Sequence, residues 1–139
     1  MKSALIIEDE EGVTQAVSTS LIGFVKKTAT TMTDAIAALR QHEFDVIFLD
    51  LALPDSSPSR TLEMLPMLRI LAKDSAIIIM TGYKNAIGNA RFAVDSVLEK
   101  PFHSGNIRDA LADANLALAR NRCAIDDTAQ MCRAFLAFP

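Results

Sequence analysis

Residues 46–50 read VIFLD, four consecutive apolar residues followed by an acid. A continuous apolar run of this length is typical of a strand that is buried on both faces, as in a parallel sheet. Similar short runs recur along the chain, and the stretches between them carry apolar residues at helical spacing. The strands predicted from these runs are residues 4–7, 28–32, 46–49, 76–80 and 96–98.

Helical stretches follow the predicted strands in strict alternation. This pattern predicts an α/β domain with a parallel sheet and right-handed crossovers. Five strands with five flanking helices match a flavodoxin-like, doubly wound sheet of order 2-1-3-4-5. Gly88 weakens the fourth helix, and Ser104 is the expected N-cap of the fifth. The helices are expected at residues 13–24, 36–39, 62–71, 85–93 and 104–121.

The composition is that of a single globular domain. Of the 139 residues, 50% are apolar and 22% are charged, which excludes disorder and allows a core without a disulfide or zinc site. The net charge of −3 argues against direct nucleic-acid binding, which needs a basic surface. Cys123 and Cys132 have the spacing of neither a disulfide framework nor a metal site. Because no apolar stretch suits a membrane span or a signal peptide, we expect a cytoplasmic protein without membrane contact.

Polar residues stand where the predicted strands end. In an open parallel sheet, ligands bind at the carboxyl ends of the strands, at the point where the strand order reverses. That point lies between the first and third strands, so the acids that follow them are expected side by side, with a hydroxyl and a lysine beyond. These strand-end residues are Glu8 and Asp9, then Asp50, then Thr81 and Gly82, then Glu99, Lys100 and Pro101.

Gathered carboxylates indicate a cation site. Two like charges about 4 Å apart repel by roughly 4 kcal/mol at an effective dielectric constant near 20, so a metal ion, a lysine or a shared proton must offset them. Oxygen ligands without histidine or cysteine favour Mg²⁺. Asp50 can accept a phosphoryl group as an acyl phosphate, while Lys100 and Thr81 supply a positive charge and a donor.

Four motifs together resemble the receiver domain of two-component response regulators, of the chemotaxis-regulator type. They are Glu8-Asp9-Glu10, the sequence LDLALPD at 49–55, MTG at 80–82 and EKPF at 99–102. Each motif alone is weak, but their order and spacing at strand ends are specific. The resemblance divides the chain into a receiver domain, residues 1–121, and a C-terminal tail, residues 122–139, that could add a helix.

The resemblance implies a catalytic set of Asp50, Thr81 and Lys100. Asp50 would be the phosphorylation site, taking phosphate from a phosphohistidine of a sensor histidine kinase or a histidine phosphotransfer protein. Thr81 and Lys100 would hold the phosphoryl oxygens. Asp9, Asp50 and the backbone carbonyl of Ala52 would bind Mg²⁺, with Glu8 acting mainly through a metal-bound water.

The resemblance also assigns regulatory positions. Ala52 and Tyr83 flank the site where hydrolysis of the acyl phosphate is tuned, and the bulk of Tyr83 is expected to slow water attack. Thr81 would move toward the phosphoryl group as the switch residue. Val97 stands where the family usually has an aromatic switch residue, which puts the standard coupled switch in doubt. Pro101 would follow a cis peptide bond.

The loop after Asp50 departs from the family pattern as well. It reads SSPS at 56–59 where a glycine is usual. Pro58 can open the next helix in its first turn. The departure is therefore compatible with the fold, and the sequence does not determine the conformation of this loop.

Four functions are candidates for such a sequence. The preferred one is a phosphorylation-dependent switch, not an enzyme, with output by protein contact through residues 84–120 and a homodimer as one option. The alternative is a pseudo-receiver that acts as a phosphorylation-independent adaptor, which Val97 and the unusual loop favour slightly. A haloacid-dehalogenase-type phosphatase needs a second aspartate where Ala52 stands, and the acids after the first strand would repel a flavodoxin's phosphate. His42 and His103 have no features of a phosphodonor.

Overall fold

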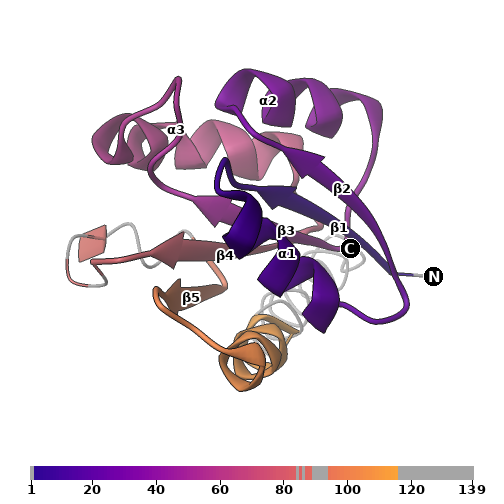
Figure 1. The fold of residues 1–139 in the computed structure, drawn as a ribbon. Helices are drawn as coiled ribbons and strands as arrows, with labels where there is room; N and C mark the ends of the chain where they lie inside the picture. Colours follow the sequence, from indigo (N-terminus) through magenta and orange to yellow (C-terminus); the bar gives the residue numbers. More distant parts are fainter. Residues whose placement is uncertain (1, 84, 86, 89–93, 116–139) are drawn as a thin grey trace, which may run out of the picture.

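A computed structural model describes residues 2–83, 85, 87–88 and 94–115, and its centre is a five-stranded parallel sheet (Figure 1). The strand order is β2-β1-β3-β4-β5, and every neighbouring pair is parallel. This confirms the predicted flavodoxin-like topology. The strands are β1 (Lys2–Ile7), β2 (Phe24–Ala29), β3 (Val46–Asp50), β4 (Ala76–Thr81) and β5 (Ser96–Glu99).

Helices cover both faces of the sheet. In Figure 1, α2 (Met32–Gln41) and α3 (Pro58–Leu71) lie on one face, and α1 (Glu11–Ser20) and the helical residues 104–115 lie on the other. Two separate clusters of buried apolar side chains match these two layers. Successive residues of β1 and β3 alternate between the clusters, which is why both strands read as unbroken apolar runs.

The predicted second strand was misplaced. The structure ends α1 at Ser20 and places β2 at Phe24–Ala29, so Phe24 starts the strand, and Met32 belongs to α2. The physical reason is that β2 is an edge strand whose residues are mostly exposed, so it lacks the apolar run of a central strand. Gly23, with φ of 83°, makes the turn into it.

The last described helix has a different cap from the one expected. Helical residues start at 104, and His103 precedes them as the cap, because its Nδ1 accepts the Gly105 N–H at 3.1 Å. In return, Asn106 Oδ1 accepts the His103 N–H at 3.0 Å, which makes a reciprocal pair like a capping box. Ser104 is therefore the first residue of the helix.

Four helices are present among the described residues, against the five expected. Of the expected helix at 85–93, only residues 85 and 87–88 are described, and they form a short 3₁₀ turn. The rest of that stretch and residues 116–139, which include the expected C-terminal tail and both cysteines, lie outside the described part of the chain. Within that part, no helix has the length and apolar character needed to cross a membrane.

Candidate functional site

The strand-end residues meet at one edge of the sheet. Backbone hydrogen bonds continue past the strands: the Glu8 N–H bonds the Ala29 carbonyl at 3.0 Å, and the Lys100 N–H bonds the Thr81 carbonyl at 2.7 Å. These bonds hold the residues that follow β1 and β5 in register with neighbouring strands. The edge carries a cleft of about 530 Å³ whose lining includes Glu8, Asp9, Asp50, Ala52, Thr81, Tyr83 and Lys100.

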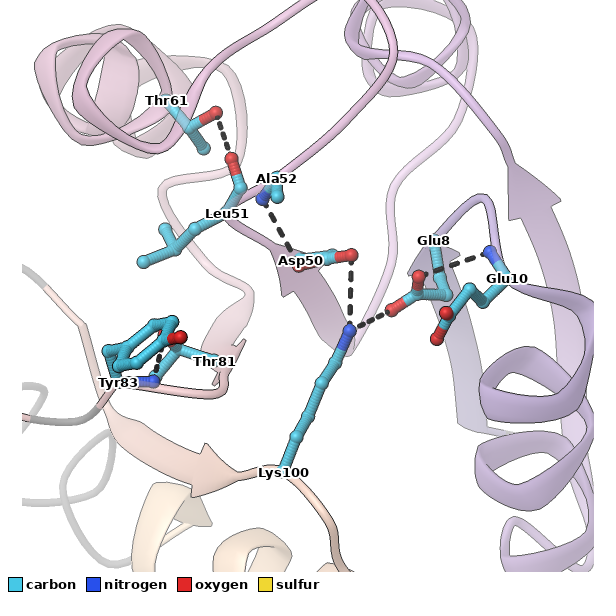
Figure 2. Close-up of polar contacts among 9 residues, drawn as sticks. All are labelled: Glu8, Glu10, Asp50, Leu51, Ala52, Thr61, Thr81, Tyr83 and Lys100. Atoms are coloured by element: carbon cyan, nitrogen blue, oxygen red, sulfur yellow. Dashed lines mark hydrogen bonds and ion pairs between the residues drawn. The ribbon is translucent and has the colours of Figure 1, made fainter.

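Lys100 joins two buried acids at the centre of this cleft (Figure 2). Its Nζ lies 2.9 Å from Glu8 Oε2 and 3.2 Å from Asp50 Oδ2. The Glu8 side chain is fully buried, and the Asp50 side chain is 8% exposed. Because buried carboxylates repel each other strongly, the shared ammonium is what lets both occupy the site.

Burial also sets the protonation of this group. Burial, with the nearby Asp50 carboxylate, raises the pKa of Glu8 from 4.5 to about 7, although the hydrogen bond from Lys100 opposes the rise. Burial alone would lower the pKa of Lys100, but the hydrogen bond to Glu8 and the negative charges of Asp50 and Glu8 outweigh it and raise that pKa. Lys100 therefore stays charged at neutral pH, whereas Glu8 sits near its midpoint.

Three carboxylates form a group suited to a divalent cation. Glu8, Asp9 and Asp50 each offer one oxygen, and these oxygens lie within 4.8 Å of one another. Glu8 and Asp50 are buried, while Asp9 is exposed at the cleft. The donor set contains oxygen alone, which fits a hard cation such as Mg²⁺ or Ca²⁺ rather than zinc.

The loop after β3 brings Ala52 to the phosphoacceptor candidate. The Ala52 N–H donates to Asp50 Oδ1 at 3.1 Å, so the two carboxylate oxygens of Asp50 have different partners, an amide and an ammonium. The buried Thr61 hydroxyl bonds the neighbouring Leu51 carbonyl at 2.7 Å. Thr61 was missed by the sequence reasoning because a threonine within a helix gives no signal of this contact.

Thr81 and Tyr83 occupy the β4 side of the cleft (Figure 2). Thr81 is buried, and its Oγ1 accepts the Tyr83 N–H at 3.1 Å. This local turn leaves the Tyr83 side chain at the rim, where the residue is 80% exposed.

Val97 lies outside the cleft. It is half-buried on β5, pairs with Ile79 of β4, and packs against the buried cluster under α2 and α3. The cleft thus gathers all the predicted site residues except Val97. The Lys100–Pro101 peptide bond is cis, as expected.

Comparisons with known proteins identify the class. Residues 4–112 match the family model described as the response regulator receiver domain. A response regulator receiver domain from Methylobacillus flagellatus is 31% identical, with a TM-score of 0.70 over 82% of this chain and 98% of that chain. A response regulator from Burkholderia pseudomallei, solved with a phosphorylated aspartic acid, a calcium ion and citrate, is 26% identical with a TM-score of 0.71, over 87% of this chain and 73% of that one.

The chain is also similar to part of a longer regulator. The cell cycle response regulator CtrA of Brucella ovis is 27% identical over 105 residues, which are 74% of this chain and 45% of that protein. The chain therefore spans less than half the length of this curated relative. The chain belongs to the response regulator receiver domain family of two-component systems.

Proposed function

We propose that this chain is a phosphorylation-dependent switch whose phosphoacceptor is Asp50. The observation that carries the proposal is the ammonium of Lys100 placed between the carboxylates of Glu8 and Asp50, at the carboxyl edge of a parallel sheet. A structural ion pair would need no cleft, but this one lines an open cleft beside Asp9 and Thr81. The phosphorylated aspartic acid of the Burkholderia pseudomallei regulator supports the same chemistry here.

The proposed reaction transfers a phosphoryl group from a phosphohistidine to Asp50. An Asp50 carboxylate oxygen attacks phosphorus, the P–N bond breaks, and the electron pair stays on the imidazole nitrogen, which then takes up a proton. Lys100 neutralises charge on the phosphoryl oxygens, and Thr81 donates its hydroxyl hydrogen to them, because the hydrogen bond from the Tyr83 N–H uses only a lone pair of Thr81 Oγ1. Most of the catalysis is then positioning and charge neutralisation.

Mg²⁺ is the proposed cofactor. Asp9, Asp50 and the Ala52 carbonyl would hold it, with Glu8 acting through a bound water. When bound, the ion would offset the repulsion among the acids and the incoming phosphoryl oxygens. The Burkholderia pseudomallei regulator was solved with a calcium ion, which supports binding of a divalent cation by this chain.

The proposed partners follow from the family. A sensor histidine kinase or a histidine phosphotransfer protein would supply the phosphoryl group in the cytoplasm. Output would pass by protein contact through the surface of residues 84–120, of which the structure describes 85, 87–88 and 94–115. Homodimer formation through this surface, and a role for the tail at 122–139, are parts of the same proposal.

Phosphorylation by a small donor tests the proposal. Acetyl phosphate with Mg²⁺ should add the mass of one phosphoryl group to the wild type and none to Asp50→Asn, with Asp45→Asn as the control for an exposed aspartate at the other end of β3. Val97, already packed in place of the usual aromatic residue, favours the pseudo-receiver adaptor as the second candidate. An unmodified wild type under these conditions would support the adaptor instead.

A further inference from the structure

Asp55 lies in the loop between β3 and α3, yet its carboxylate contacts the first turn of α2. Oδ1 accepts the Met32 N–H at 2.7 Å, and Oδ2 accepts both the Thr33 N–H at 3.0 Å and the Thr33 hydroxyl at 2.8 Å. The two loops it joins follow β2 and β3, which are separated in the sheet by β1. The contact therefore crosses over the end of β1, the strand that Glu8 and Asp9 follow.

These bonds complete the N-terminus of α2. The first N–H groups of a helix have no partner within the helix. Thr31 Oγ1 accepts the Asp34 N–H at 3.1 Å, and Asp55 accepts the two N–H groups before it. A negative charge is favoured at this end of a helix, and the same hydrogen bonds lower the pKa of Asp55, so the carboxylate stays ionised.

The other end of the loop is tied to the phosphoacceptor site. Ala52, three residues before Asp55, donates its N–H to Asp50. Leu53 and Ser56, which lie on either side of Asp55, exchange backbone hydrogen bonds of 3.0 and 3.2 Å and make the loop a closed turn. Displacing Asp55 would therefore move this turn as a unit, together with the Ala52 backbone.

We propose that Asp55 is a positioning residue for the phosphoacceptor site. The hydrogen bonds that Asp55 accepts from Met32 and Thr33, which we call the latch, fix the β3–α3 loop to α2. The latch thereby holds the Ala52 backbone next to Asp50 and the proposed metal position. This inference rests on the proposed function for the role of Ala52 as a metal ligand. In the sequence, Asp55 is the last residue of the LDLALPD motif, and its partners on α2 are two backbone N–H groups and the Thr33 hydroxyl, more than 20 residues away.

The test compares variants that remove different acceptors from the same helix end. Asp55→Ala deletes all three hydrogen bonds between the loop and α2, two of which cap backbone N–H groups of the helix. Thr31→Ala deletes one capping bond of α2 and leaves the contacts of the β3–α3 loop in place. Asp55→Asn, with one acceptor oxygen, is a milder variant in case Asp55→Ala folds poorly. Two readouts are taken on each folded protein: Mg²⁺ affinity by calorimetry, and the amide signal and hydrogen exchange of Ala52 by NMR without metal.

If the latch positions Ala52, Asp55→Ala should weaken Mg²⁺ binding about 10-fold, the usual scale for a residue that orients a metal ligand, with Asp55→Asn between it and the wild type. It should also shift the Ala52 amide signal and speed its exchange, while Thr31→Ala changes neither. Equal effects of Asp55→Ala and Thr31→Ala would show a helix cap alone and overturn the proposal. If the wild type bound no Mg²⁺, the metal assignment would fail, and the Ala52 amide would still decide the latch.

Discussion

Replacing Glu8 by glutamine should stabilise the protein at neutral and alkaline pH in the absence of divalent cations. Glutamine has the shape of the protonated glutamate, but it cannot ionise. In the wild type, the fully buried Glu8 side chain must ionise next to the Asp50 carboxylate, with one ammonium to serve both. The substitution removes that cost and keeps a side-chain oxygen for the Lys100 hydrogen bond.

The size of the effect follows from the pKa. A rise from 4.5 in the unfolded chain to about 7 in the folded protein corresponds to about 3 kcal/mol. Because the folded state holds its proton more tightly, the wild type loses this stability as pH rises from 4.5 to about 7. The advantage of Glu8→Gln should therefore be near zero at pH 4, grow through this window, and level off near 3 kcal/mol by pH 8.

Urea denaturation in buffer with a chelator, repeated from pH 4 to 8, measures this difference. Glu10→Gln is the matched control, because Glu10 is exposed two residues away, and its curve should run parallel to that of the wild type. Adding Mg²⁺ should reverse the order of stability, since a cation favours the ionised carboxylate. The reasoning would be refuted by a stability difference between Glu8→Gln and wild type that does not change with pH.

Three further predictions concern neighbouring contacts. Lys100→Ala leaves Glu8 and Asp50 without their shared cation. Because Lys100 is partly exposed, the loss in the free energy of unfolding, measured in urea, should be only about 2 kcal/mol. Mg²⁺ should restore part of this loss. Tyr83→Ala opens the rim of the cleft and should shorten the acyl-phosphate lifetime a few-fold; an unchanged lifetime would count against the shielding role. Asp95→Ala removes the acceptor of the Ile77 N–H and of Arg69 and should cost about 2–3 kcal/mol in urea denaturation. Asp45→Ala should cost less, about 1 kcal/mol, because the hydrogen bonds that Asp45 accepts from Ser3 are exposed to solvent.

The central strands could be predicted because burial on both faces requires a continuous run of apolar residues. β1, β3 and β4 each have layers of side chains above and below, so their runs are apolar throughout. β2 has one neighbouring strand and carries Lys26 and Lys27 in its middle, so it resembles a loop. Its placement depends on pairing with β1, a contact between residues far apart in the chain, which periodicity cannot register.

The site was predictable for a related reason. In a parallel sheet, topology alone brings the residues after β1, β3, β4 and β5 to one edge, so Glu8, Asp50 and Lys100 could be placed together before any distance was known. The contacts that shape the loop after Asp50 could not be predicted from the sequence. Thr61 bonds a backbone carbonyl, and Asp55 bonds two backbone N–H groups of α2 besides the Thr33 hydroxyl. Backbone partners have no residue type by which a sequence could identify them.

Charge at the cleft links the structure to the proposed switch. An ammonium group has three donors, and Lys100 commits two of them to Glu8 and Asp50. A phosphoryl group on Asp50 would replace one negative charge by about 1.5 to 2 and present new acceptor oxygens. The third donor of Lys100 is available to one of these oxygens, and the proton that Glu8 holds near neutral pH, or a divalent cation, would offset part of the added negative charge. A change in the contacts of Lys100 and in the protonation of Glu8 is therefore the expected local response to phosphorylation, whatever surface carries the output.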